Sequence, residues 1–476
     1  MSRLAVWAPL LALLAACGGH ASSTALPAGQ VVLYVDTDAP LPSAEQAGTQ
    51  DPPALFDQLL IDIYAPGSTE PCEGCSRLFE VDSEQVRARA VSFGVLTPPG
   101  VTGYAARVRL FRARNASGGD PPAFSTLEVV AALPKVSSEG IVEAAVVLHV
   151  DDLGVPRGSL AQPIQASLGK PQHSLVGTWP GAQRVPCSAP PRDGEACVPG
   201  GAFWMGNAAG VVAPDGSFDP GVRLVVLDPF YMALHETTVA ELRRSGNAVS
   251  SAGSALDPVG GSLGIAVDAQ PYDFTDPRFF CDYTFEPAKG DLSQEDKAVN
   301  CVSWDVARTY CASLSADLPT EAQYEYAAGA LRSRAYPWGD DLEGISCDSA
   351  VCDRGNLGAF FVSDLWGACR TLGTYGGPAA PGSGARDLVP LEGGAVADLA
   401  GNLNEWSLDN WNRLSEPCMQ QPLLHNPLCL AQSTDGDMRT VKGGGWFQPP
   451  FPVSIRAGAD PTLRRAQTGF RCARSN

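Results

Sequence analysis

The first third of the chain alternates short apolar runs with polar turns. In the run YAARVRLF, Tyr104 and every second residue after it are apolar, whereas Arg107 and Arg109 fall on the opposite face. This two-residue period, bounded by clusters of Gly, Pro and Asp, predicts strands with one buried face. The predicted strands are residues 31–35, 59–64, 104–111, 127–133 and 142–150. Together they predict an all-β sandwich of immunoglobulin type over residues 31–152, without a catalytic constellation.

A helical period replaces this alternation further along the chain. In VSWDVARTYCASL, apolar residues recur at helical spacing behind Ser303, which is a good N-cap. In LPTEAQYEYAAGAL, Thr320 and Gln323 have the spacing of a capping box ahead of a second apolar face. We therefore predict a second domain over residues 190–476. Residues 153–189, rich in Pro, Gly, Ser and Gln, are expected to be a linker.

The first residues, MSRLAVWAPLLALLAACGG, have the organisation of a secretory signal. Arg3 precedes an apolar stretch that is too short to span a bilayer. The tetrapeptide Leu-Ala-Ala-Cys ending at Cys17 resembles a bacterial lipobox, in which the Cys is lipidated; an ordinary signal peptide with an incidental Cys is the alternative. We expect a signal peptide at residues 1–16, lipidation of Cys17 and a polar tether at residues 17–30. Gly18 gives no hint of inner-membrane retention, so the expected location is the cell envelope, at the outer membrane.

Composition narrows the partners and the redox environment. A net charge of −19 makes the surface repel nucleic acid and anionic headgroups, so the lipid anchor is the one membrane contact expected. No later stretch has the length and apolarity of a transmembrane helix. The 14 Cys of an exported chain imply disulfides. Cys72 and Cys75 have no second CxxC and no His nearby, so we expect a local disulfide there rather than zinc.

Seven marks of the second domain occur in the order of a known family. They are CVPGGAFWMG, DPFYMALHETT, VNCVSWDVARTYC, LPTEAQYEYAA, YPWGD, VADLAGNLNEW, and KGGGW with a closing GFR. In this combination the chain resembles the formylglycine-generating enzymes, also called sulfatase-modifying factors, from Cys197 to its end. The resemblance implies an α+β domain with an elaborated C-type-lectin-like fold.

The resemblance also implies an oxidation of cysteine, but this chain lacks the two cysteines that bind the metal for it. The family oxidises a sulfatase Cys to formylglycine with oxygen and copper(I), held by two thiolates that follow its RGGSW motif. The matching segment here, WFQPPFPVSIRAG, contains no Cys. Cys472 matches a family Cys that pairs with the one at Cys311, so the resemblance implies a Cys311–Cys472 disulfide. Copper is therefore not expected, and no catalytic residue is assigned.

Calcium is the metal that the resemblance retains. The family binds two structural calcium ions through carboxylate and carbonyl oxygens, the hard ligands that calcium prefers. The matching residues are Asp398, Gly401, Leu403 and Glu405 in one site, the middle two through their carbonyls, and Asn356 and Leu357 in the other. The alternative is that these carboxylates cap turns without a metal.

Two main functions fit these observations, and a purely structural envelope protein is a third, weaker alternative. The first is an anchored, non-catalytic binding module for a protein, peptide or glycan ligand. The alternative is an oxidoreductase of the formylglycine-generating type that acts on a protein Cys or another sulfur substrate through a different metal set. Cys347, Cys352 and Cys369 are candidates for that set, although we favour a disulfide between the first two. Residues 247–290 and 418–429 look inserted, and they either shape a ligand face or form solvated loops.

Overall fold

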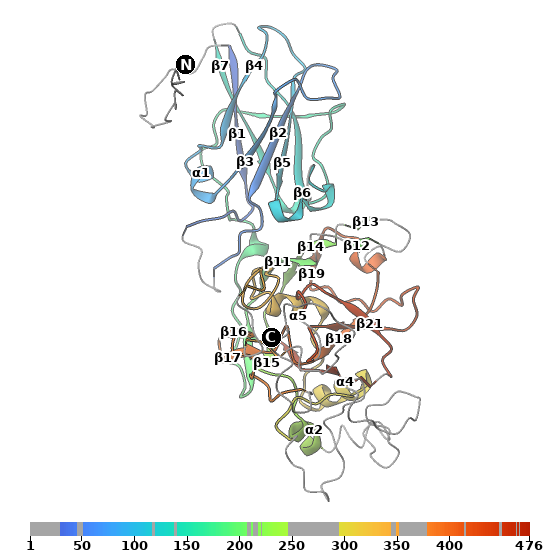
Figure 1. The fold of residues 1–476 in the computed structure, drawn as a ribbon. Coiled ribbons are helices and arrows are strands. Elements are labelled where there is room, and N and C mark those ends of the chain that lie inside the picture. The colour runs from blue at the N-terminus through green and yellow to red at the C-terminus, as the bar shows by residue number, and fades with distance from the viewer. Residues whose placement is uncertain are drawn as a thin grey trace, which may run out of the picture.

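The computed structural model describes most of the chain as two domains (Figure 1). The described residues are 29–44, 51–116, 120–137, 140–206, 211–212, 218–219, 221–245, 295–343, 349–351, 378–413, 416–446, 450–462, 464–465 and 467–476. The expected signal peptide and Cys17 lie outside these ranges, as do Asn356, Leu357, Cys347, Cys352 and Cys369. Within the ranges, no helix has the length and apolar character needed to cross a membrane.

Two sheets form the N-terminal domain. The first has the strand order β4 (Ser92–Leu96), β1 (Gln30–Thr37), β7 (Ile141–Leu148), β9 (Ser167–Leu168). The second has the order β3 (Ser76–Glu80), β2 (Gln58–Tyr64), β5 (Ala105–Phe111), β6 (Thr126–Ala132), β8 (Ile164–Gln165). A short helix, α1 (Ser83–Arg87), and the 3-10 turn η1 (Ala113–Asn115) lie between strands. The five predicted strands are present as β1, β2, β5, β6 and β7.

The inner faces of these two sheets share one apolar core. Val31, Leu33 and Val35 project into it from alternate positions of β1. They meet Ile61 of β2 and Val108 of β5 in the same core. The alternation in the sequence therefore divides the side chains of each strand between the core and the outer face, as the pleat requires.

The outer face of β5 carries the two arginines that the alternation placed there. Arg107 pairs with Glu128 of the adjacent β6 at 2.8 Å, and Arg109 pairs with Asp62 of β2 at 2.6 Å. The second pair is almost fully buried. These cross-strand pairs link the three central strands of the sheet through their side chains.

Residues 153–189 differ from the linker that their composition indicates. β8 and β9 lie within this segment and extend the two sheets by pairing with β6 and β7. Val176, Trp179 and Ala182 are buried in the sandwich core. Composition is misleading here because two-residue edge strands and a few buried side chains need no long apolar run.

The C-terminal domain is α+β, with small sheets packed around short helices (Figure 1). Its larger sheets have the orders β10 (Glu195–Val198), β15 (Phe230–Ala233), β23 (Ala473–Ser475); β11 (Gly201–Gly206), β14 (Val222–Leu227), β19 (Leu423–His425); and β21 (Ala457–Ala459), β20 (Arg439–Lys442), β18 (Asn404–Asn410), β22 (Thr468–Gly469). Two strand pairs are β12 (Val211–Val212) with β13 (Phe218–Asp219), and β16 (Leu388–Leu391) with β17 (Gly394–Ala397). The helices include α2 (Val239–Ser245), α4 (Trp304–Ser313) and α5 (Glu321–Ala328).

Both helices predicted for this domain are present, as α4 and α5. The Thr320 hydroxyl accepts a hydrogen bond from the backbone N–H of Gln323, and the Gln323 side chain accepts one from the N–H of Thr320, which completes the predicted capping box. Ser303 occupies the N-cap of α4, but its hydroxyl makes no capping hydrogen bond. Leu314, which the helical period places on the buried face, is the C-cap of α4 and is half exposed.

The two domains pack against each other through apolar side chains. Trp204 of β11 is buried, and its ring packs edge-on against Phe56 with 5.6 Å between centroids. Its indole N–H donates to the carbonyl oxygen of Leu55 at 2.7 Å. The guanidinium of Arg223 lies 4.1 Å from the ring centroid of Phe124. The core of the sandwich thus continues into the first strands of the C-terminal domain.

Disulfides link distant parts of the chain. Cys311 of α4 is bonded to Cys472, which directly precedes β23. The other described pairs are Cys72–Cys75, Cys187–Cys197 and Cys418–Cys429, and Cys301 is also disulfide-bonded. The local Cys72–Cys75 bond agrees with the expectation for that CxxC.

Candidate functional site

The loop between β17 and β18 holds three of the residues matched to the first calcium site, Asp398, Gly401 and Leu403, and Glu405 follows in β18. Asp398 and Asn402 adopt positive φ angles of 56° and 63°, a backbone region in which Asp and Asn are tolerated better than most residues. A Cβ atom added at Gly401 would lie 2.7 Å from the carbonyl oxygen of Val351, so glycine is needed at this close approach. The loop is therefore a compact turn that holds the Asp398 carboxylate inside the domain.

Glu405, the second residue of β18, and Arg471, between β22 and β23, form a fully buried ion pair beside this loop. The Nε and Nη2 atoms of Arg471 each donate to a different Glu405 carboxylate oxygen at 2.7 Å. The Tyr324 hydroxyl also donates to Glu405, at 3.2 Å. Arg471 further donates to the carbonyl oxygens of Ala397 and Asp398. Arg471, from the closing GFR motif, thus fastens the C-terminal end of the chain to the loop.

Four buried carboxylates surround this guanidinium. Asp398 accepts a hydrogen bond from the backbone N–H of Gly382, while Glu236 accepts from the Asn402 side chain and the N–H of Leu403. Burial raises the pKa of Asp387 to about 7 and that of Asp398 to about 6, and it raises the pKa of Glu236 well above its usual value. Glu405 completes the set. Four buried carboxylates thus lie around one guanidinium, and their mutual repulsion adds to burial in raising the pKa values of Glu236, Asp387 and Asp398.

The residues of the first calcium site fit that ion in chemistry and charge. The Oδ1 atom of Asp398 is buried and has no hydrogen-bond partner among the described residues. A buried carboxylate oxygen is costly when it is left without a partner, and calcium takes such hard oxygens together with backbone carbonyls. Glu405 already accepts from Arg471 and Tyr324, so a metal would share that carboxylate with them. Within the described ranges, no group of three or more His, Cys, Asp or Glu side chains is arranged to hold a metal ion, so calcium here would also need the carbonyl oxygens of Gly401 and Leu403.

The described residues of the segment matched to the copper thiolates are partly buried in the domain. Trp446 at its start is fully buried, and Val453 belongs to the main core of the domain. Arg456 donates to both carboxylate oxygens of Glu321, at 2.6 and 2.7 Å. Cys472, the last Cys of the chain, is bonded to Cys311. These residues offer no thiolate, so the segment does not fit a copper(I) site.

A second buried charge cluster was not anticipated from the sequence. On α5, Glu321 and Glu325 are both buried, and Lys442 of β20 lies 2.7 Å from Glu325 and 3.8 Å from Glu321. Asp409 of β18 accepts hydrogen bonds from the backbone N–H groups of Glu321 and Cys429. The one available signal was the presence of two glutamates in LPTEAQYEYAAGAL, a helix whose other positions are mostly apolar.

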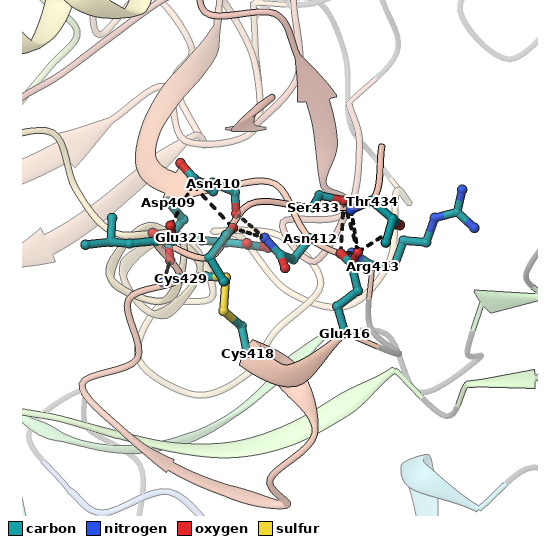
Figure 2. Close-up of a disulfide and its surroundings, with 12 residues drawn as sticks. Glu321, Asp409, Asn410, Asn412, Arg413, Glu416, Cys418, Cys429, Ser433 and Thr434 are labelled. Carbon is teal, nitrogen blue, oxygen red and sulfur yellow. Dashed lines mark hydrogen bonds between the residues drawn. A yellow bond between two sulfur atoms is a disulfide. The ribbon is translucent and has the colours of Figure 1, made fainter. Parts of the chain in front are cut away.

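This cluster supports the loop of residues 418–429 (Figure 2). The Cys418–Cys429 disulfide closes the loop, and the backbone N–H of Cys429 is held by Asp409. Glu416 accepts hydrogen bonds from both Ser433 and Thr434. Within the loop, β19 pairs with β14. The loop is therefore held in the fold by a disulfide, a hydrogen bond and a strand pairing.

Asp409 makes the stability of the domain dependent on pH. Burial, followed by repulsion from Glu321, raises the pKa of Asp409 to about 7. In the unfolded chain an aspartate has a pKa of about 3.9. Between this pH and the pKa of the folded state, Asp409 therefore holds a proton in the folded chain that it has released in the unfolded chain. As the pH rises from about 4 to about 7, the free energy of unfolding should therefore fall, and above about 7 this contribution is lost. The variant Asp409→Asn should lack this pH-dependent part of the free energy of unfolding. Denaturant unfolding of the wild type and the variant between about pH 5 and pH 8 would measure it. A stability difference between the two chains that stays constant across this range would contradict the prediction.

Comparison with known proteins agrees with the resemblance. The chain matches the sulfatase-modifying factor enzyme 1-like domain over residues 183–476, and it belongs to that family. It is 25% identical to the formylglycine-generating enzyme of Mus musculus over 295 residues, which is 58% of this chain and 73% of the mouse protein. It is 27% identical to the formylglycine-generating enzyme of Streptomyces coelicolor over 310 residues, 59% of this chain and 88% of that protein.

Another relative has a name that denotes loss of activity. The chain is 28% identical over 197 residues to the inactive C-alpha-formylglycine-generating enzyme 2 of Bos taurus, covering 39% of this chain and 53% of the bovine protein. Among solved structures, PvdO from Pseudomonas aeruginosa aligns with 21% identity and a TM-score of 0.39, over 59% of this chain and 94% of PvdO.

Proposed function

We propose that the protein is an exported lipoprotein whose C-terminal domain binds a ligand or partner without catalysing cysteine oxidation. The observation that carries this proposal is the segment after KGGGW, in which no Cys occurs before Cys472. Cys472 itself is committed to a disulfide with Cys311. The family includes relatives named inactive, so loss of the activity has a precedent within it.

The remaining features of the proposal concern location and architecture. Lipidation of Cys17 would hold the protein at the outer membrane of the cell envelope. The N-terminal sandwich, which we interpret as immunoglobulin-like, would act as a spacer, and the C-terminal domain would have the C-type-lectin-like fold of its family. A lectin-like fold presents irregular loops, and a protein, peptide or glycan is the class of partner that such loops suit.

Copper(I) binding separates this proposal from the oxidoreductase alternative. In a competition titration against a chromogenic copper(I) chelator, we expect the purified chain to remove no copper(I) from the chelator. An active family member should remove copper(I) under the same conditions. Soft thiolates are the ligands that would retain copper(I) against the chelator. Retention of one equivalent would favour the oxidoreductase, with Cys347, Cys352 and Cys369 as the first residues to replace.

Calcium is proposed as a structural ion held by Asp398 and Glu405 with the carbonyl oxygens of Gly401 and Leu403. When bound, it would supply positive charge to a loop in which four buried carboxylates face one guanidinium. A second ion at Asn356 and Leu357 is proposed from the family resemblance alone.

Removal of calcium should lower the melting temperature of the chain. A ligand that binds only the folded state at roughly 100 times its dissociation constant stabilises by about 2.7 kcal/mol, which corresponds to several degrees in a domain of this size. Calorimetry with chelator, and again after calcium is restored, would measure the shift. Asp398→Asn should abolish the response while keeping a residue that tolerates positive φ. Identical melting curves for the wild-type chain with and without chelator would remove the calcium proposal.

A further inference from the structure

A cavity lies between the sandwich and the C-terminal domain. Its volume is about 230 Å³, and both domains contribute to its lining. Arg112 and Asn115 come from the end of β5 and from η1, while Arg334, Tyr336 and Ser454 come from the C-terminal domain. The apolar contact of Trp204 with Phe56 holds the two domains together beside the cavity. Docking of the two domains therefore creates this space, and neither domain forms it alone.

Asn115 is a buried polar side chain whose hydrogen-bonding groups are unused. It is 2% exposed, and neither its Oδ1 nor its Nδ2 atom has a hydrogen-bond partner in the described parts of the chain. Buried amides in folded proteins are almost always satisfied, because leaving one unpaired costs its full desolvation penalty. Since Asn115 lines the cavity, a bound molecule can supply the missing partners.

The cavity also carries two arginines that make no ion pair with a described carboxylate, although Asp340 acts on Arg112 from a distance. Arg114 is paired with Asp340 at 2.6 Å, and Glu325 is paired with Lys442 at 2.7 Å. No hydrogen bond or ion pair between described residues joins either Arg112 or Arg334 to a carboxylate. Burial and the charge of Arg114 lower the pKa of Arg112, and the opposing effects of Asp57 and Asp340 do not cancel them. Two arginines thus remain available in a chain whose net charge is −19.

We propose that this interdomain cavity binds a small oxyanion, with Arg112 and Arg334 as its charge partners and Asn115 as a hydrogen-bond donor. The guanidinium fork matches the two oxygens of a carboxylate or phosphate. The carbonyl oxygen of Asn115 would accept from a hydroxyl or amine group on the same ligand. A volume of about 230 Å³ lies below the range of drug-sized pockets, so the ligand is a small acid. This inference rests on the proposed binding function and deepens it by naming a ligand class.

The test is the thermal stability of the purified chain in different anions at one ionic strength. Acetate and succinate probe a carboxylate, inorganic phosphate probes a phosphate, and chloride is the reference. We expect at least one oxyanion to raise the melting temperature by several degrees at saturation, because it binds only when the two domains are docked. The anion that gives the larger shift in melting temperature shows whether the cavity prefers a carboxylate or a phosphate. No shift with any of the three oxyanions would overturn the proposal.

Variants separate a defined site from a general salt effect. Arg112→Ala and Arg334→Ala should each lose the oxyanion-dependent shift, whereas Arg87→Ala, on the exposed face of α1, should keep it. Asn115→Leu removes the unpaired amide at similar volume, so it should raise the melting temperature without anion and abolish the shift. Equal shifts in all four variants would overturn the site. Since these melting curves do not involve cysteine oxidation, their outcome is distinguishable from failure of the proposed function.

Discussion

Replacing Arg471 by Met should lower the free energy of unfolding of the C-terminal domain by about 3–5 kcal/mol. Arg471 and Glu405 are both fully buried, and two hydrogen bonds of 2.7 Å join them. Removal of the guanidinium leaves Glu405 charged in a medium that cannot solvate it, or forces it to take up a proton. Breaking a buried pair from one side costs this desolvation energy, even where the pair itself adds little net stability.

A surface pair provides the matched control for this variant. Arg308 of α4 also makes two-oxygen contact with a carboxylate, that of Asp317, but both side chains are more than a third exposed. Water screens such a pair, so Arg308→Met should cost about 1 kcal/mol or less. The double variant Arg471→Met/Glu405→Gln should recover part of the stability, because it removes the uncompensated charge. Denaturant unfolding that found equal costs for the two single variants would contradict the role of burial.

Removal of the Cys311–Cys472 disulfide should cost about 5 kcal/mol. The bond joins residues separated by 161 positions, so it restricts the unfolded chain over more than half of the C-terminal domain. In the chain-entropy description, the loss on removal grows with the logarithm of the loop length. The paired replacement Cys311→Ala/Cys472→Ala should therefore unfold at a distinctly lower denaturant concentration than the wild type.

The second loop-closing disulfide is the control for this prediction. Cys418–Cys429 has a separation of 11, so Cys418→Ala/Cys429→Ala should cost about 3 kcal/mol by the same relation. Both replacements remove the same number of sulfur atoms, and therefore the difference between them reports the loop length. If the short-loop variant were the less stable of the two, chain entropy could not be the main contribution of these bonds.

Local patterns predicted the local structure well. The alternation in YAARVRLF is the strand β5, and the capping box at Thr320 starts α5. The run DLAGNLNEW placed Asp398 and Glu405 close in sequence, and both side chains are buried near Arg471. The order of the seven motifs identified the family. Each of these signals is contained in a short stretch of residues.

Features that depend on distant partners could not be predicted in the same way. Arg471 pairs with Glu405 across 66 positions, and Arg456 pairs with Glu321 across 135. The interdomain cavity combines Arg112, Arg334 and Ser454, which no sequence period connects. Residues 153–189, predicted as a linker, are a further example. β8 and β9 form there because they pair with the edges of β6 and β7, which are distant in sequence.

The most direct test of the account is oxidation of a peptide cysteine by the purified chain. The chain is incubated with copper(I), reductant, oxygen and a peptide containing the sulfatase-type Cys-x-Pro-x-Arg sequence, beside an active formylglycine-generating enzyme as control. Mass spectrometry reports loss of the thiol and gain of the aldehyde. The account predicts an unchanged peptide with this chain and conversion by the control. Conversion by this chain would contradict the proposal that the domain binds without catalysis, and would direct attention to Cys347, Cys352 and Cys369.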